Sequence, residues 1–266
     1  MQRWARGLAP ALLGLLAFAA TLAPPAAVGP GKVVRPFLVY YGGVPDPANQ
    51  QAARALARRM AGYPVVVLGL AAHDPAFARR VRRLAPRTAF YGYDDTGHVT
   101  FAKVFGLLRL FRSLHFQGAL LDDIGTGLST RPGALARIVR TAHRDGLRVL
   151  LNAWNPQDVL NLPLWPGRDA ILCENWVYSS GRLAQPRAPA TYAALRSLER
   201  RGILVFMIAT TGGTPSPAHL PVLGLGATAR TVFGDYLALS DPVYSADNDA
   251  ILPAAALRRL LRSLSF

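Results

Sequence analysis

From residue 33 onward the sequence alternates between apolar, β-rich runs and amphipathic helical runs. The expected strands span residues 33–42, 64–70, 88–94, 118–123, 148–154, 169–177, 203–210 and 237–240. The expected helices span residues 47–62, 74–84, 101–115, 132–145, 156–160, 190–201, 227–236 and 251–264. Continuous apolar strands are typical of a parallel sheet that is buried on both faces. The alternation therefore predicts an α/β fold built from strand–helix units.

Eight such units predict a closed (β/α)8 TIM-type barrel, a single domain formed by residues 30–266. An open doubly wound sheet is the alternative, and it would bind its ligand where the strand order reverses. No G-x-G-x-x-G motif follows the first expected strand, and no Walker motif occurs. The sequence contains no linker that indicates a second domain.

The first 29 residues have the pattern of a signal peptide. Arg3 and Arg6 precede an apolar stretch over residues 8–22, and small residues and prolines follow it. The stretch is short for a membrane-spanning helix, although an uncleaved anchor is the alternative. We therefore expect export, either secretion or delivery to the periplasm or cell envelope, and no membrane span in the mature form.

The chain is strongly basic, with 30 Lys and Arg against 15 Asp and Glu and a formal charge of +15. Such a surface attracts nucleic acid, anionic lipid or anionic polysaccharide. The arginines fall mostly on expected helices, as Arg54, Arg58 and Arg59 do, which is typical of solvated outer faces. No basic run is interleaved with aromatic residues, as a single-strand binder needs. We therefore do not expect a nucleic-acid partner.

Carboxylates close two of the expected strands. In a barrel of this kind the chemistry lies at the C-terminal ends of the strands. Asp122 follows the apolar run 119–121, and Glu174 follows the apolar run 170–173. A carboxylate at the end of a buried run is costly unless it is paired or used. Asp122 and Glu174 are therefore the candidate catalytic pair, and Asp123 is a possible third catalytic acid.

Aromatic and amide side chains accompany these acids at the strand ends. The candidate substrate-binding residues are Tyr41, Tyr91, Tyr93, Asp94, Asn152, Trp154, Trp176 and Tyr178. Two carboxylates with an aromatic surround suit glycoside hydrolysis, in which one acid protonates the leaving oxygen and the other attacks or activates water. The alternative is that the acids cap a loop or helix while the aromatics fill the barrel mouth.

Four short runs carry a family resemblance. They are Phe90-Tyr91-Gly92-Tyr93, Gly118-Ala119-Leu120-Leu121-Asp122-Asp123, Leu150-Leu151-Asn152-Ala153 and Ile171-Leu172-Cys173-Glu174. In these runs the chain resembles the endo-α-1,4-polygalactosaminidases of glycoside hydrolase family 114, related to the spherulation-specific family 4 proteins. The resemblance covers residues 34–211 and implies a (β/α)8 barrel, with Asp122 and Glu174 at the positions of the family's catalytic acids. At the position of Asp123 the family often has a non-acid.

The resemblance implies hydrolysis of an α-1,4-linked, galactosamine-containing polysaccharide. That polymer is cationic when deacetylated, and like charges slow encounter with a basic protein, so a neutral or anionic glycan is the alternative substrate. Two other functions stay open, a non-catalytic glycan-binding protein on the same barrel and a basic envelope protein held by anionic lipid or polymer.

No cofactor or metal is expected from the sequence. The five histidines show no metal-ligand spacing, and no His-x-x-x-His partner accompanies Asp94 and Asp95. Cys173 is the single cysteine, which excludes an internal disulfide and a cysteine zinc site. Its place within an apolar run predicts that it is buried.

Overall fold

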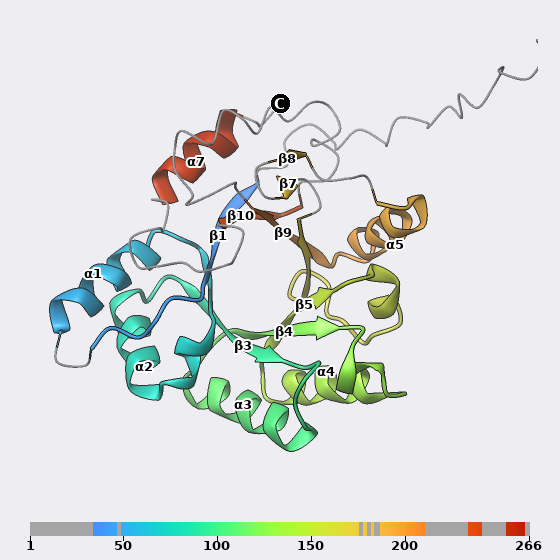
Figure 1. Cartoon of the computed structure of the whole chain (residues 1–266), viewed down its shortest axis with the longest axis horizontal. Coiled ribbons are helices and arrows are strands. Elements are labelled where there is room, and N and C mark those ends of the chain that lie inside the picture. Colours follow the sequence, from blue (N-terminus) through green and yellow to red (C-terminus); the bar gives the residue numbers. More distant parts are fainter. Residues whose placement is uncertain are drawn as a thin grey trace, which may run out of the picture.

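The computed structural model describes residues 34–46, 49–175, 178–179, 182–183, 187–210, 234–240 and 254–263. Eight parallel strands close into a barrel, which confirms the predicted (β/α)8 fold (Figure 1). In order around the barrel the strands are β1 (Arg35–Tyr40), β2 (Val65–Leu68), β3 (Ala89–Asp95), β4 (Gly118–Ile124), β5 (Arg148–Ala153), β6 (Ala170–Glu174), β9 (Leu204–Thr210) and β10 (Tyr236–Ser240).

Helices lie on the outside of the barrel (Figure 1). They are α1 (Gln50–Met60), α2 (Pro75–Leu84), α3 (Phe101–Ser113), α4 (Ala134–Arg144), α5 (Pro189–Arg200) and α7 (Ala254–Ser263). Short 3-10 helices are η1 (Leu70–His73), η2 (Gly127–Thr130) and η3 (Pro156–Val159). A hairpin of β7 (Tyr178–Ser179) and β8 (Arg182–Leu183), which the sequence analysis did not predict, follows β6.

The last strand–helix unit differs from the prediction at one boundary. Residues 227–233 of the predicted helix 227–236 lie outside the described residues. Tyr236, the last residue of that prediction, belongs to strand β10. The segment 1–29, predicted as a signal peptide, also lies outside the described residues. Within the described part of the chain, no helix combines the length and apolar character that crossing a membrane requires.

Two-residue alternation divides the side chains of each strand between the barrel interior and the helix layer. The interior is filled by Phe37, Val39, Val65, Val67, Tyr91, Leu120, Leu150, Ala170, Leu172, Phe206, Ile208 and Ala238. Residues of the opposite phase, such as Leu121, Leu151 and Cys173, are buried against the helices. Both faces are therefore apolar, which explains why the strands are continuous apolar runs in the sequence.

Large rings fill the lower half of the barrel, at the N-terminal ends of the strands. Phe206 stacks on Tyr236 at a centroid distance of 4.2 Å and meets Phe37 edge-on at 4.9 Å. Tyr91 lies over Gly118, where a Cβ atom would be only 2.3 Å from the tyrosine ring. Glycine at the start of β4 therefore makes the space that the Tyr91 ring occupies.

Asp169 ties several elements together at this lower end. Its side chain is fully buried, and its carboxylate accepts hydrogen bonds from the backbone N–H groups of Val149 at 3.0 Å and Trp165 at 2.6 Å. His143, near the end of α4, lies 2.9 Å from the same carboxylate and stacks on the Trp165 ring at 3.7 Å. A single buried acid thus joins α4, β5 and the segment before β6.

Replacing Asp169 with alanine should destabilise the barrel. Two backbone N–H groups, one buried and one part-buried, would lose their acceptor at about 1–3 kcal/mol each, so we expect the free energy of unfolding to fall by about 2–6 kcal/mol. Urea unfolding followed by circular dichroism measures this loss. The matched control is Asp158→Ala, at an exposed acid of η3, which should change stability by less than about 0.5 kcal/mol. Equal effects of the two substitutions would contradict the anchoring role of Asp169.

Candidate active site

Every second side chain of a strand faces the barrel interior. Beyond the buried interior residues, the next side chains that face inward line the mouth at the C-terminal ends of the strands. Each of these residues lies two positions beyond an interior apolar residue, as Asp122 does beyond Leu120 and Glu174 beyond Leu172. The set is Tyr41, Tyr93, Asp122, Asn152, Glu174 and Thr210. We call these six residues the mouth layer. It brings together both predicted catalytic acids and three of the predicted substrate-binding residues.

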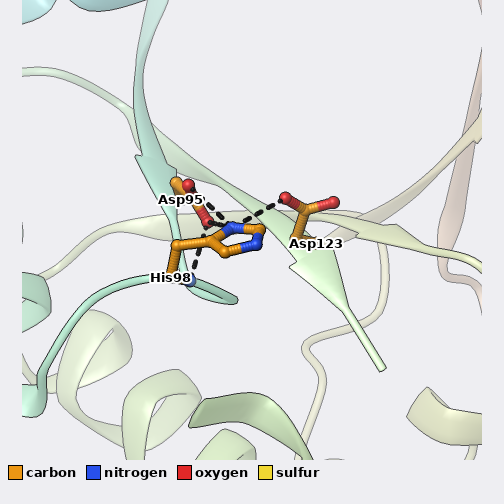
Figure 2. A group of neighbouring side chains, drawn as sticks. All are labelled: Asp95, His98 and Asp123. Atoms are coloured by element: carbon orange, nitrogen blue, oxygen red, sulfur yellow. Dashed lines mark hydrogen bonds and ion pairs between the residues drawn. The ribbon is translucent and has the colours of Figure 1, made fainter. Parts of the chain in front are cut away.

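The end of β4 separates two successive acids. The register between β4 and β5 shifts between Leu121 and Ile124, and Asp123 has a positive φ of 54°. Asp122 therefore still faces the barrel interior. The carboxylate of Asp123 instead approaches His98, with Oδ2 of Asp123 3.4 Å from Nδ1 of His98 (Figure 2). Such bulges often re-aim a side chain next to an active site.

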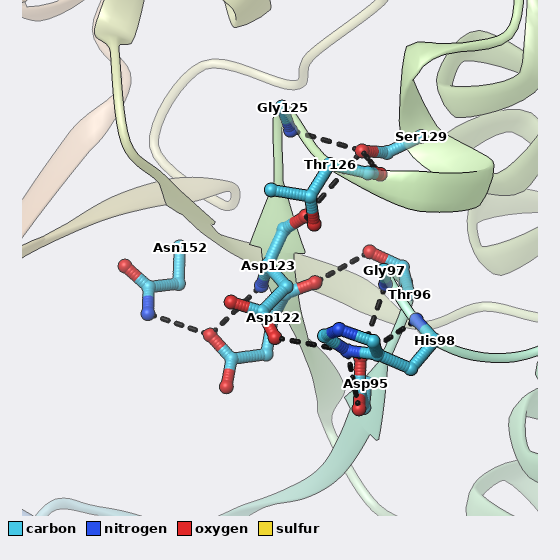
Figure 3. Close-up of polar contacts among 10 residues, drawn as sticks. All are labelled: Asp95, Thr96, Gly97, His98, Asp122, Asp123, Gly125, Thr126, Ser129 and Asn152. Carbon is cyan, nitrogen blue, oxygen red and sulfur yellow. Dashed lines mark hydrogen bonds and ion pairs between the residues drawn. The ribbon is translucent and has the colours of Figure 1, made fainter.

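Asp122 is held by donors from three directions. Its Oδ1 accepts hydrogen bonds from Nδ2 of Asn152 at 2.6 Å and from the backbone N–H of Asp123 at 2.9 Å (Figure 3). The side chain of Tyr93 makes a further hydrogen bond to the carboxylate. Strands β3, β4 and β5 thus fix one carboxylate in a defined orientation.

Burial governs the proton affinities at this point of the mouth layer. Burial raises the pKa of Asp122, and the hydrogen bonds from Asn152, Tyr93 and Asp123 oppose that rise only in part. Burial and the adjacent Asp122 carboxylate also raise the pKa of Tyr93, so its hydroxyl stays a neutral donor. A carboxyl with a raised pKa in a fixed orientation is chemically suited to hold or release a proton.

Glu174 ends β6 in a similar way. Its side chain is half-buried, and the next residue, Asn175, has a positive φ of 56°. The Asn175 backbone donates to the carbonyl of Ile208 at 2.9 Å, and its side-chain oxygen accepts from the hydroxyl of Thr210. Both acids of the mouth layer are therefore followed by a left-handed, non-glycine residue. Such conformations cost free energy and cluster at functional sites.

The strand order sets the spacing of the two acids. Strand β5 alone separates β4 from β6, so the backbones that carry Asp122 and Glu174 are about 10 Å apart. Side chains extending toward each other from that distance cover the separations of about 5–9.5 Å at which paired carboxylates cleave glycosides. The spacing accommodates both the retaining and the inverting mechanism.

Other predicted binding residues lie elsewhere. Trp154 follows β5 at the rim with 73% of its surface exposed, where its ring is open to solvent. Tyr91 lies deeper, in the buried interior beneath Tyr93, and is not brought into the mouth layer. Trp176 and the side chain of Tyr178 lie outside the described residues.

Asp94 has the opposite phase to Tyr93 and is fully buried. Neither of its carboxylate oxygens has a hydrogen-bond partner among the described residues. It lines a cavity of about 300 Å³ next to the mouth layer, together with Tyr41, Tyr93, His73 and Lys103 among others. Burial, with a smaller contribution from Asp95, raises the pKa of Asp94 to about 7.

Two features of this region were not predicted from the sequence. Thr210 shares the interior phase of Ile208, and strict alternation along β9 could have placed it in the mouth layer. His98 lies beside the carboxylates of Asp95 and Asp123, a grouping that combines the loop after β3 with the end of β4. Linear spacing gives no signal for that grouping, because it depends on how two loops pack together.

No family model matches the chain, and no curated protein matches its sequence. Similar solved structures include the glycoside hydrolase domain of PelA from Pseudomonas aeruginosa, with a TM-score of 0.54, 14% identity, and coverage of 81% of this chain and 98% of that one. Tryptophan synthase from M. tuberculosis gives a TM-score of 0.54 and 12% identity, and the match covers 87% of this chain and 94% of that one. A mandelate racemase/muconate lactonizing protein from Herpetosiphon aurantiacus gives a TM-score of 0.52 and 13% identity. The match covers 82% of this chain and 58% of that one. At these identities the likeness shows a shared barrel fold.

Replacing Asp94 with asparagine should make the stability of the protein less dependent on pH. The pKa of Asp94 is about 7 in the folded state against an ordinary value of 3.8. Its ionisation therefore opposes folding increasingly as the pH rises from about 4 to 7. We expect Asp94→Asn to raise the free energy of unfolding at pH 8 by about 1–3 kcal/mol, with little gain at pH 4.

Urea unfolding of the two proteins at pH 4, 6 and 8 measures the difference. Asp158→Asn, which removes a carboxylate from the exposed surface of η3, is the control and should give parallel curves. A stability difference between Asp94→Asn and the parent that stays constant across this pH range would contradict the assignment.

Proposed function

We propose that the chain is a glycoside hydrolase that cleaves a polysaccharide, with Asp122 and Glu174 as its catalytic pair. The observation that carries the proposal is the presence of both acids in the mouth layer, on strands separated only by β5. The fold shared with the glycoside hydrolase domain of PelA agrees with it. The resemblance of the strand-end sequences to glycoside hydrolase family 114 supports the same reaction class.

In the proposed reaction one acid protonates the glycosidic oxygen while the other attacks the anomeric carbon or activates a water molecule. The hydrogen bonds of Asn152 and Tyr93 orient the Asp122 carboxylate for either role. The exposed ring of Trp154 at the rim can stack on a sugar ring. The separation of the two carboxyl groups decides whether the anomeric configuration is retained or inverted.

For the substrate we propose an α-1,4-linked, galactosamine-containing polysaccharide. The resemblance in the four strand-end runs supports this choice. The formal charge of +15 favours segments whose amino groups are acetylated and therefore neutral. We further propose that residues 1–29 direct export to the cell envelope or the exterior, where polysaccharides of this kind occur.

A non-catalytic glycan-binding protein is the second candidate. The exposed Trp154 ring at the rim suits sugar binding without any bond cleavage. This candidate predicts saturable binding to a polysaccharide without release of reducing ends. The variants of the two acids described below separate the two functions, because a protein that only binds glycans has no hydrolytic activity for these substitutions to remove.

Replacing either acid with its amide should abolish hydrolysis. Asp122→Asn and Glu174→Gln each remove a proton donor or acceptor of the proposed reaction, which contributes about 10²–10⁴-fold to the rate. We expect kcat to fall by at least about 100-fold in each variant. Release of reducing ends from a panel of purified polysaccharides measures the loss.

The matched control is Glu199→Gln on helix α5, which replaces the second glutamate of the chain. It should keep the parent kcat, and circular dichroism should show that all three variants remain folded. Full hydrolytic activity in Asp122→Asn or Glu174→Gln would end the assignment of that acid.

Acetylation of the substrate should increase the rate of hydrolysis at low salt. Deacetylated galactosamine is cationic and is repelled by a basic protein, whereas its acetylated form is neutral. We expect kcat/KM to be higher for the acetylated polymer at 20 mM NaCl, and the ratio to shrink at 500 mM NaCl because salt screens the repulsion. Faster hydrolysis of the deacetylated polymer at low salt would contradict this substrate preference.

A further inference from the structure

We propose that Asp95, His98 and Asp123 form a binding site for one divalent metal ion beside the mouth layer. One ligand atom from each residue lies within 4.8 Å of the other two. The residues come from the end of β3, the loop that follows it and the end of β4, and their side chains converge (Figure 2). The site therefore joins two neighbouring strand–loop segments of the barrel.

The distances suit metal coordination. Nδ1 of His98 lies 3.1 Å from both carboxylate oxygens of Asp95 and 3.4 Å from Oδ2 of Asp123. Metal–ligand bonds of about 2.0–2.2 Å place neighbouring donor atoms about 3.0–3.5 Å apart. The two distances from His98 are therefore those of neighbouring ligands of one ion, and the ligand atoms of Asp95 and Asp123 lie within 4.8 Å of each other.

One imidazole nitrogen faces several carboxylate oxygens in this grouping. Nδ1 of His98 carries at most one hydrogen, yet it faces three carboxylate oxygens. Oδ1 of Asp95 also accepts from the backbone N–H groups of Gly97 and His98, and water can reach the other carboxylate oxygens at this exposed place. A cation with several coordination positions would engage all of these oxygens at once.

Local backbone structure brings the ligands together. A Cβ atom on Gly97 would lie 2.5 Å from Oγ1 of Thr126 and 2.8 Å from Cβ of Asp123, so only glycine allows the loop after β3 to lie this close to the loop after β4. The carbonyl of Asp123 accepts a hydrogen bond from Oγ1 of Thr126 at 2.8 Å (Figure 3). This contact accompanies the left-handed conformation of Asp123, in which Oδ2 lies 3.4 Å from Nδ1 of His98.

The donor set indicates the class of metal. One imidazole and two carboxylates suit Zn²⁺, Mn²⁺ and similar transition ions, whereas Ca²⁺ and Mg²⁺ prefer oxygen donors alone. The His98 side chain is 71% exposed, so water has access to the remaining coordination positions. We therefore assign the site to a solvent-accessible transition-metal dication with three protein ligands.

A metal ion at this site would act on the barrel mouth through its charge and by linking two loops. It would neutralise two of the acids next to Asp122 and hold the loops after β3 and β4 together. The ligands are distinct from Asp122 and Glu174, so the metal site stands or falls independently of the proposed glycosidase activity.

The test uses the full chain purified without a polyhistidine tag and treated with chelator. Isothermal titration with ZnCl₂ and MnCl₂ should show one saturable ion per chain. At a free Zn²⁺ concentration 100 times the Kd, the Tm should rise by about 5–10 °C. His98→Ala and Asp123→Asn should each weaken Zn²⁺ binding by at least about tenfold, because each removes a direct ligand.

The matched control is His115→Asn, at an exposed histidine with positive φ after α3, which should bind Zn²⁺ as the parent does. X-ray absorption of the Zn²⁺ complex should show one imidazole among oxygen ligands. The proposal is overturned if no ion binds below about 1 mM, if Ca²⁺ binds more tightly than Zn²⁺, or if His98→Ala and Asp123→Asn leave binding unchanged.

Discussion

Closure of eight parallel strands into a barrel determines where every side chain of the candidate site points. Once the sheet is closed, residues of one phase must face the interior and residues of the other must face the helices. Leu120 and Leu172 fill the interior, so Asp122 and Glu174, two positions later, enter the mouth. An open sheet has no shared interior, and acids from β4 and β6 would face a flat surface instead. Any glycoside chemistry therefore depends first on closure and only then on the acids.

At the end of β4, a small backbone irregularity turns two adjacent acids toward different partners. Regular alternation would send Asp123 into the layer between barrel and helices. The register shift and the positive φ of 54° turn it toward His98 instead, while Asp122 stays with Asn152. The turn also lets the Asp123 backbone N–H donate to the Asp122 carboxylate. A strained conformation of this kind persists because the surrounding contacts over-determine it.

The sequence predicts the regular part of this protein better than its loops. Continuous apolar runs and amphipathic helices suffice for the barrel, because burial of the strands on both faces leaves a direct mark on composition. The alternation of side chains along each strand likewise places Asp122, Asn152 and Glu174 together at the C-terminal end of the barrel. The same alternation places Tyr91 one layer below Tyr93, over Gly118, although the sequence prediction grouped both as substrate-binding residues. Alternation does not reveal the approach of His98 to Asp123, which depends on contact between two loops with no common periodicity.

Four neighbouring acids of one basic chain end in three different environments. Asp94 is fully buried at the cavity beside the mouth layer, with its pKa raised to about 7. Asp122 is oriented by an amide and a phenol. Asp95 and Asp123 face a shared imidazole at the solvent boundary. Residue type alone cannot separate these cases, since all four are aspartates at strand ends. The alternation along β3 and β4 and the bulge in β4 do separate them. The backbone, more than composition, therefore determines which carboxylate faces the barrel mouth.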